Sequence, residues 1–560
     1  MTELTGVGVS PGVGFGPGYV FTREIPVPAP DARHGGDAGA ERDRAAWALQ
    51  QVAADLEERG TRAGGDAQEI LNAQALMARD PGLAAEVAEL IEAGTSAARA
   101  VYEGFGRYRE MLVEAGGYLG ERAADLDDVR DRAVAVLEGL PMPGLPSRGP
   151  QPYVLIARDL APADTALLSK DVVAAFVTEQ GGPTSHTAIL ARAMGVPAVV
   201  ACPAATSIAP GTSVLVDGAS GLVRPAPSEE EVATARKTAA AREAVLAAAT
   251  GPGMTADGHA VPLLANIGGP RDVDRALEYG AEGVGLYRTE FLFLDRTTAP
   301  SEEEQEAAYL AVLDAFPGGR VVVRTLDAGA DKPLAFLPPS GEEPNPALGQ
   351  RGARLLKAHP GILNAQLGAL ARAASRSSAK LQVMAPMVAT AEEAAWFAAA
   401  CRDAGLPSAG VMIEIPSAAL RASDLAEQVD FFSLGTNDLA QYTFAADRQV
   451  GALTALQDAW QPALLDLITL AVAGAVERGK PCGVCGEAAG DPVLACVLVG
   501  LGVTSLSMAA PALPAVRAAL SRHTGEQCLL AAQAALAAVS AQEARAAARV
   551  HLPGLAGLAL

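Results

Sequence analysis

Short apolar runs alternate with segments of helical periodicity over the second part of the chain, from about residue 251 onwards. Eight of these runs have the length and composition of buried strands: 261–266, 283–287, 320–325, 381–385, 411–414, 431–435, 481–485 and 503–508. Eight strand–helix units in roughly 250 residues is the size of a (β/α)8 barrel. The pattern therefore predicts such a barrel, with a doubly wound sheet as the alternative architecture.

The pattern before the barrel is of two kinds. Between about residues 41 and 140, apolar residues such as Leu49, Val52 and Leu56 recur at helical spacing and predict a four-helix bundle. Short strands separated by glycine turns are expected on either side of this bundle: 6–21, 153–156, 172–177, 198–200 and 213–218. The simplest assembly inserts the helical bundle into a small β/α domain that is built from both flanking segments.

Linkers rich in proline and glycine, at residues 23–39 and 141–152, support this division. A chain of 560 residues is also too long for one core. The pattern predicts a multidomain α/β protein in four parts: a β/α domain of residues 1–22 plus 146–227, a helical domain of 23–145, a linker helix of 228–250 and a barrel of 251–560. The linker helix begins with Ser228 followed by three glutamates, which is typical of a capping box.

Composition and charge narrow the class of protein. The formal net charge is -22, which argues against a nucleic-acid partner because phosphate backbones require a basic face. Six cysteines are scattered along the chain and indicate a reducing compartment rather than a disulfide framework. The first residues lack the pattern of a signal peptide, and the longest apolar run, 493–503, is too short to span a bilayer. We therefore expect a cytoplasmic protein without membrane insertion.

A glycine turn at residues 181–187 contains the first candidate for chemistry, His186. The turn lies between a predicted buried strand and a segment that favours a helix, which ends before Gly195. His186 falls in the first turn of that helix, where free backbone N–H groups and the helix dipole favour negative charge. This position suits an imidazole that carries a phosphoryl group. The alternative is a capping turn whose histidine is merely exposed.

Charged residues gather where the predicted barrel strands end, which is where parallel barrels hold their active sites. They occur at the ends of the second, third, fifth and sixth strands, and a cysteine ends the seventh: Arg288, Arg324, Glu414, Asn437 with Asp438, and Cys485. Arginine guanidinium groups and carboxylates at one end of a barrel suit the binding of a phosphorylated anion and Mg²⁺. Surface ion pairs are the alternative for any single residue. Cys482 and Cys485 could also form a redox pair or half a zinc site.

Several long motifs, in a fixed order, resemble one family. They include Gly-Gly-Pro-Thr-Ser-His186-Thr, Leu-Tyr-Arg288-Thr-Glu, Arg324-Thr-Leu-Asp-Ala-Gly-Ala-Asp-Lys332, Gly-Gln-Arg351, Met-Ile-Glu414-Ile-Pro, Gly-Thr-Asn437-Asp438 and Cys485-Gly-Glu. The chain resembles Enzyme I, the phosphoenolpyruvate–protein phosphotransferase of the bacterial sugar phosphotransferase system, over nearly its whole length. The resemblance implies a swivelling β/α domain that carries the phosphohistidine, followed by a phosphoenolpyruvate-binding barrel.

The resemblance also implies a role for individual residues. His186 would accept the phosphoryl group, Thr165 would orient its imidazole, and Cys485 would donate a proton to the enolate carbon. Glu414 and Asp438 would bind Mg²⁺. Six residues would surround the phosphate and carboxylate of phosphoenolpyruvate: Arg288, Arg324, Lys332, Arg351, Asn437 and Arg448.

The resemblance further implies that the helical domain docks the phosphocarrier protein HPr and that the barrel forms a homodimer. The β/α domain would swing between the barrel and HPr. Two other functions are weighed against this one: an acidic scaffold that only binds HPr, and a barrel lyase or aldolase that acts on an enolpyruvate. A scaffold needs no metal or phosphate residues, and a lyase leaves His186 without a role.

Overall fold

The computed structural model describes residues 3–21, 25–63, 65–115, 123–140, 142, 151–160, 168, 170–182, 186–294, 296–329, 334–337, 341, 343–447 and 451–558. The chain divides into two compact units, Met1–Ala239 and Ala240–Leu560. Each unit has hydrophobic clusters of its own. The chain is therefore a multidomain α/β protein, as the pattern predicts.

The second unit contains a closed barrel of eight parallel strands. In chain order these are β9 Leu263–Ile267, β10 Gly283–Arg288, β11 Arg320–Arg324, β12 Lys380–Ala385, β13 Ala409–Ile413, β14 Phe431–Leu434, β15 Cys482–Val484 and β16 Ser505–Met508. Each strand pairs with the next, and β16 closes the barrel on β9. Each of the eight predicted runs overlaps one strand, so the predicted (β/α)8 barrel is confirmed and the doubly wound alternative is wrong.

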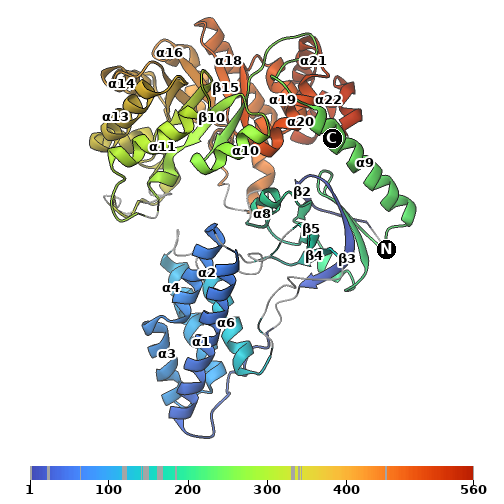
Figure 1. Ribbon diagram of the computed structural model, residues 1–560, viewed down its shortest axis with the longest axis vertical. Helices are drawn as coiled ribbons and strands as arrows, with labels where there is room; N and C mark the ends of the chain where they lie inside the picture. The colour runs from blue at the N-terminus through green and yellow to red at the C-terminus, as the bar shows by residue number, and fades with distance from the viewer. Residues whose placement is uncertain are drawn as a thin grey trace. The chain divides into compact units, whose positions relative to one another are not determined.

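Helices follow the strands and cover the outside of the barrel (Figure 1). They are α10 Val273–Glu278, α11 Glu302–Asp314, α12 Ala353–Ala358, α13 Pro360–Arg376, α14 Ala391–Asp403, α15 Pro416–Leu420, α16 Ala422–Ala426, α17 Thr436–Phe444, α18 Pro462–Glu477, α19 Pro492–Gly500, α20 Leu513–Leu520, α21 Gly525–Leu536 and α22 Ala541–Val550. Local capping fixes several starts, because the Ser301 and Thr390 hydroxyls accept backbone N–H groups of α11 and α14. The cluster of buried side chains between helices and strands is the largest in the chain.

One helical segment, Ala455–Glu477, is long and apolar enough to cross a membrane by length and composition, and 44% of its apolar window is buried. The segment includes α18, which packs against α15 and α16. Leu464, Ile468 and Ala471 are buried on the packed face of α18. This helix therefore forms part of the barrel's outer layer.

The first unit contains an eight-stranded sheet in the order β1-β8-β7-β3-β4-β5-β6-β2. Its strands are β1 Leu4–Thr5, β2 Val7–Ser10, β3 Val13–Phe21, β4 Tyr153–Ala157, β5 Val173–Thr178, β6 Ala198–Val200, β7 Ser213–Asp217 and β8 Leu222–Pro225. β3 pairs in parallel with β4 and antiparallel with β7. The N-terminal strands thus complete a sheet whose other strands follow the helical segment in sequence.

The helical segment between β3 and β4 has five described helices: α1 Ala38–Ala63, α2 Gly65–Ala78, α3 Pro81–Glu92, α4 Ala97–Ala115 and α6 Ala123–Leu137. α1 packs against α2, α3, α4 and α6 around buried Val52, Leu56 and Val101 (Figure 1). The sequence predicts four helices in this segment, whereas its described residues contain five.

The predicted linker helix is present as α9, Glu229–Ala248. The Glu231 backbone N–H donates to the Ser228 hydroxyl, and the Ser228 N–H donates to the Glu231 carboxylate. The two bonds confirm the predicted capping box.

Close packing of α19 on α21 yields a stability prediction. An added methyl group at Gly500 would overlap the carbonyl oxygen of Cys528 in α21, whereas the space beside Gly361 in α13 is open. We expect Gly500→Ala to lower the free energy of unfolding by about 1–3 kcal/mol. Thermal denaturation of the full chain measures the effect, with Gly361→Ala as the control. Equal midpoints for the two variants would contradict the packing described here.

Candidate active site

Arg324 lies at the carboxyl end of β11, where it is almost fully buried among three carboxylates. Its Nη2 lies 3.0 Å from Glu290 Oε2, and its Nη1 lies 3.3 Å from Asp327 Oδ2 and 4.0 Å from Glu414 Oε1. Burial lowers the pKa of Arg324, but the charges of Glu290, Asp327 and Glu414 outweigh burial and raise it. This guanidinium is therefore a permanent positive charge in a site that excludes water.

Arg351 is also buried and faces the same carboxylates. Its Nε and Nη2 donate to Asp327 Oδ1 and Oδ2, both at 3.0 Å, in a bidentate pair. Its Nη1 lies 3.0 Å from Asp438 Oδ1 and donates to the Tyr442 hydroxyl at 3.2 Å. Asp327 thus holds two arginines in fixed orientations, and their positive charges suit an anion with several oxygen atoms.

Glu414 and Asp438 bring two carboxylates into this buried site. Glu414 Oε2 accepts the Met387 backbone N–H at 2.9 Å. Burial and the neighbouring charge of Asp438 raise the pKa of Glu414 to about 7. Two carboxylates that repel each other in a dry site fit a hard divalent cation, which commonly takes one or two carboxylates and completes its shell with substrate oxygens.

A metal site whose ligands are all protein side chains has less support than a site that substrate oxygens complete. Among the residues that the structure describes, no group of three or more His, Cys, Asp or Glu side chains is placed to hold a metal ion. All six cysteines are buried and free of disulfides. Cys482 is a buried residue of β15, and the zinc and redox interpretations of the Cys482–Cys485 pair gain no support.

Close backbone approach shapes the floor of the site. A methyl group at Gly435, directly after β14, would lie 2.6 Å from Cγ and Oε1 of Glu414. Glu414 therefore packs on a backbone surface that only glycine leaves open. At Gly486, after β15, an added methyl group would overlap the Thr436 side chain in the same way.

Cys485, Asn437 and Arg288 complete the described part of the mouth. Cys485 follows β15, and its thiol is 3.6 Å from the Leu434 carbonyl oxygen. Burial raises the pKa of this thiol to about 11. Asn437 Oδ1 accepts the Glu487 backbone N–H at 3.1 Å. Arg288 is exposed at the end of β10, where its charge interacts with Arg324 and Cys485.

His186 lies in the first unit, where it begins α8, His186–Met194, after β5. α8 ends as predicted, with Gly195 at a φ of 65°. The Gly195 N–H donates to the Arg192 carbonyl and the Val196 N–H to the Ala191 carbonyl, which is the Schellman pattern. The predicted position of His186 in the first turn of a helix is therefore confirmed for the backbone.

Comparison with known proteins agrees with this architecture. Family models match three segments of the chain: "PEP-utilising enzyme, N-terminal" at residues 5–122, "mobile domain" at 149–221 and "PEP-binding domain" at 242–524. A "Phosphoenolpyruvate-protein phosphotransferase" of Streptomyces coelicolor is 61% identical over 99% of this chain and 100% of its own length. The chain belongs to the phosphoenolpyruvate–protein phosphotransferase family. It is thus an enzyme of phosphoenolpyruvate-dependent phosphotransfer.

Other members of the phosphoenolpyruvate–protein phosphotransferase family are more distant. Relatives with the same name from Haloferax volcanii and Bacillus subtilis are 43% and 39% identical, over 93% and 94% of this chain and 94% and 95% of their own lengths. A solved structure, the NMR solution structure of Enzyme I (nEIt), is 31% identical and matches 43% of this chain and 99% of its own, with a TM-score of 0.39.

The structure brings together most of the barrel residues that the sequence singled out in this family member. Arg324, Glu414, Arg351 and Asp438 lie in one network, with Arg288, Asn437 and Cys485 at the same strand ends. Thr165, Lys332 and Arg448 lie outside the described residues, as does the side chain of His186.

Sequence reasoning underrated several residues of the site. Asp327 and Glu290 are strand-end carboxylates of the same motifs, but only their ion pairs with Arg351 and Arg324 give them a role. Tyr442 contacts Arg351 and donates to the Ala347 carbonyl at 2.5 Å. Met387 has a φ of 58°, which aims its N–H at Glu414. No sequence signal identifies these last two residues.

The packing of Glu414 against the backbone of Gly435 leads to a prediction for the phosphotransferase. Gly435→Ala should push the Glu414 carboxylate out of place and reduce the phosphoenolpyruvate-dependent rate about 100-fold, because catalysis tolerates little misplacement. Initial-rate measurements of the full chain test this. Gly269→Ala is the control, since an added methyl group after β9 meets nothing within 4 Å. Equal rates for the two variants would show that the position of Glu414 is unimportant.

Proposed function

We propose that this enzyme transfers the phosphoryl group of phosphoenolpyruvate to His186 and then to the phosphocarrier protein HPr, with release of pyruvate. This is the first step of sugar uptake by the phosphotransferase system. The buried arginine–carboxylate network at one end of the barrel supports the proposal most strongly. Its charges match a substrate that bears a phosphate and a carboxylate on the same carbon.

The substrate site, as proposed, consists of Arg288, Arg324, Lys332, Arg351, Asn437 and Arg448. Arg324 and Arg351 of this set are held by carboxylates, so they lose little rotamer freedom when a substrate binds. Electrostatic positioning is the main requirement of phosphoryl transfer, because the chemistry needs little covalent help. Arg324 and Arg351 would hold the migrating group in line with the acceptor.

Glu414 and Asp438 would hold Mg²⁺, as the repulsion between their buried carboxylates suggests. When bound, Mg²⁺ supplies positive charge that neutralises the phosphate and carboxylate oxygens of the substrate. Gly435 and the Met387 N–H would keep the Glu414 carboxylate oriented toward this position.

His186 would attack phosphorus through its neutral ring nitrogen, with Thr165 orienting the imidazole. The bond between phosphorus and the enol oxygen breaks as the nitrogen–phosphorus bond forms, which leaves the enolate of pyruvate. Cys485 would give its thiol proton to C3 of the enolate to form pyruvate. Its pKa of about 11 keeps the thiol protonated at neutral pH, as this role requires.

The proposed domains divide this work. Residues 1–22 plus 146–227 would carry His186, residues 23–145 would dock HPr, residues 228–250 would be the linker helix and residues 251–560 would bind substrate and form a homodimer. The β/α domain would move between the barrel and HPr. A cytoplasmic location fits six cysteines that form no disulfides.

Labelling with phosphate-labelled phosphoenolpyruvate and Mg²⁺ tests the proposed function. We expect wild-type protein to take up an acid-labile, alkali-stable label that HPr removes. His186→Ala should take up none, because the acceptor nitrogen is lost. Glu414→Ala should label at least about tenfold more slowly, because a metal ligand is lost. Labelling of His186→Ala at the wild-type level would refute the proposal.

The role of Cys485 predicts a second, separate outcome. Cys485→Ala should still label His186, since phosphoryl transfer precedes protonation. Exchange of the C3 protons of pyruvate with deuterated water, which needs the same group as a base, should fall about 10²–10⁴-fold. NMR of pyruvate measures this exchange. Cys482→Ala is the matched control, and equal exchange in both variants would remove Cys485 from the mechanism.

A further inference from the structure

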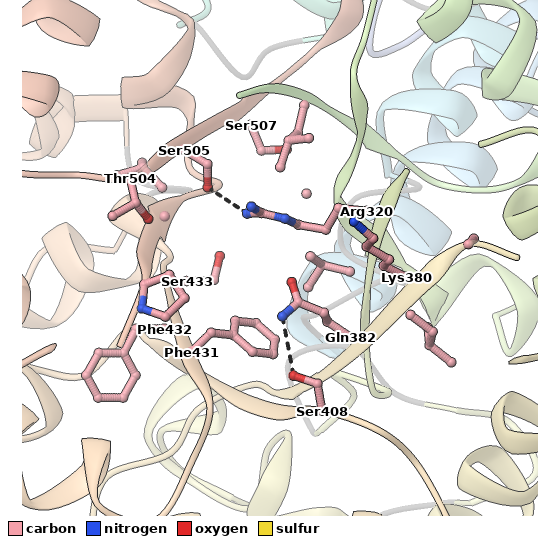
Figure 2. A pocket seen from close by; sticks show the side chains of 18 of the residues that line it. Arg320, Lys380, Gln382, Ser408, Phe431, Phe432, Ser433, Thr504, Ser505 and Ser507 are labelled. Carbon is pink, nitrogen blue, oxygen red and sulfur yellow. Dashed lines mark hydrogen bonds between the residues drawn. The ribbon is translucent and has the colours of Figure 1, made fainter. Parts of the chain in front are cut away.

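A cavity of about 480 Å³ lies in the half of the barrel where the strands begin, at the end away from the candidate active site. Figure 2 shows side chains that line this cavity. Arg320 and Val322 of β11 line this cavity. Side chains alternate between the two faces of a strand, so Arg324 lies on the same face of β11 as these two residues, and it lies in the candidate active site. Four residues of a strand span about 13 Å. The cavity and the active site therefore occupy the two halves of one barrel interior.

Small side chains leave this half of the interior open. Barrel interiors are usually filled by layers of bulky branched residues. Here Gly285, Ser433, Gly483, Ser505 and Ser507, from four different strands, line the cavity instead. The cavity is thus a consequence of residue choice on β10, β14, β15 and β16.

Two positive charges lie side by side at the entrance of the cavity. Arg320 and Lys380 are partners in register, at the first positions of β11 and β12. Arg320 Nη1 donates to the Ser505 hydroxyl at 3.3 Å, and Figure 2 shows its guanidinium extending toward Ser505. Within the described ranges, no carboxylate oxygen lies within 4.0 Å of the charged group of either residue.

Glu282 interacts with Arg320 but does not neutralise its charge. Glu282 raises the pKa of Arg320, but burial lowers it by more. The Glu282 Oε1 atom already accepts the backbone N–H groups of Gly253 at 2.8 Å and Leu263 at 2.9 Å. A partly buried guanidinium without a paired anion is costly. An anionic ligand would supply the missing charge.

The remaining walls favour a ligand with an apolar body. Phe431 and Val322 give the cavity apolar surface. Gln382 donates to the Ser408 hydroxyl at 3.3 Å on the side of Phe431, as Figure 2 shows. An apolar pocket with a few convergent polar groups is the usual form of a small-molecule site.

We propose that this cavity binds a small organic anion, with its carboxylate or phosphate on Arg320 and Lys380 and its apolar body against Phe431 and Val322. Nothing in the phosphotransfer reaction uses these residues. The site is a second ligand site of the barrel, distinct from the candidate active site.

Two sets of contacts connect the cavity to Cys485, and a bound anion acts through them on the proton transfer by Cys485. The Ser507 hydroxyl donates to Asn266 Oδ1 at 2.6 Å, and Asn266 Nδ2 donates to the Cys485 carbonyl oxygen at 2.9 Å. Phe431 and Val322 pack in one buried cluster with Cys485. This part of the inference rests on the proposed function.

Calorimetric titration of the full chain tests the binding site. Benzoate and phenyl phosphate are the probes with the two head groups, and benzyl alcohol and inorganic phosphate lack the charge or the apolar body. We expect at least one of the two organic anions to bind saturably and more tightly than either control compound. Arg320→Met should weaken this binding at least about tenfold, because it removes a charge-assisted hydrogen bond.

Two further variants keep this test decisive. Lys380→Met, at the exposed first position of β12, should also weaken binding. Arg402→Met removes an exposed charge at the end of α14 that does not line the cavity, and it should leave binding unchanged. The site is refuted if neither anion binds wild-type protein saturably, or if binding is equal in wild type, Arg320→Met and Lys380→Met.

The rate at which the C3 protons of pyruvate exchange with deuterated water tests the connection to Cys485. The anion that binds should change this rate at least about twofold in wild-type protein and not in Arg320→Met. An unchanged rate despite binding would overturn the connection and leave the site standing. If phosphoenolpyruvate did not label His186 in the absence of any added anion, the proposed function would instead be refuted. The calorimetric result does not depend on that function.

Discussion

The buried carboxylate of Asp327 is the interaction on which the barrel's functional end depends. This carboxylate accepts two hydrogen bonds from Arg351 and forms an ion pair with Arg324. The backbone N–H of Asp327 donates to Glu290, and Glu290 also forms an ion pair with Arg324. Charges can remain in a dry site only when such partners compensate for the lost water. This closed set of contacts therefore fixes the ends of β10 and β11 and the position of Arg351.

The network also explains why the site is rigid before any substrate arrives. Its arginines are oriented by carboxylates, and Glu414 is held between the Met387 N–H and the backbone of Gly435. Preorganised charges stabilise a transition state without reorganisation at the moment of reaction. The cost is a set of like charges held close together, as the pKa of about 7 for Glu414 indicates. That repulsion favours a cation beside Glu414 and Asp438, whereas the charges of Arg324 and Arg351 favour an anion.

The same barrel interior is built differently at its two ends. At the ends of the strands, long charged side chains compensate one another. At the beginnings of the strands, Arg320 and Lys380 face small residues and a cavity. The layer between them contains Val322, Phe431 and Cys485 in one cluster. Packed interiors transmit displacements because they have few voids to absorb them, so this layer is where the two halves of the barrel meet mechanically.

The sequence by itself determined the barrel, the strand ends that carry charge and the helix start at His186, because periodicity, glycine turns and capping residues act over a few neighbouring residues. Motif order pointed to the family that the comparisons bear out. Only the tertiary structure decided which charges pair, as Asp327 does with Arg351, and which backbone N–H groups face the site, as Met387 does. It alone revealed the cavity, because an empty volume depends on the summed size of side chains from distant strands, and no local pattern records that sum.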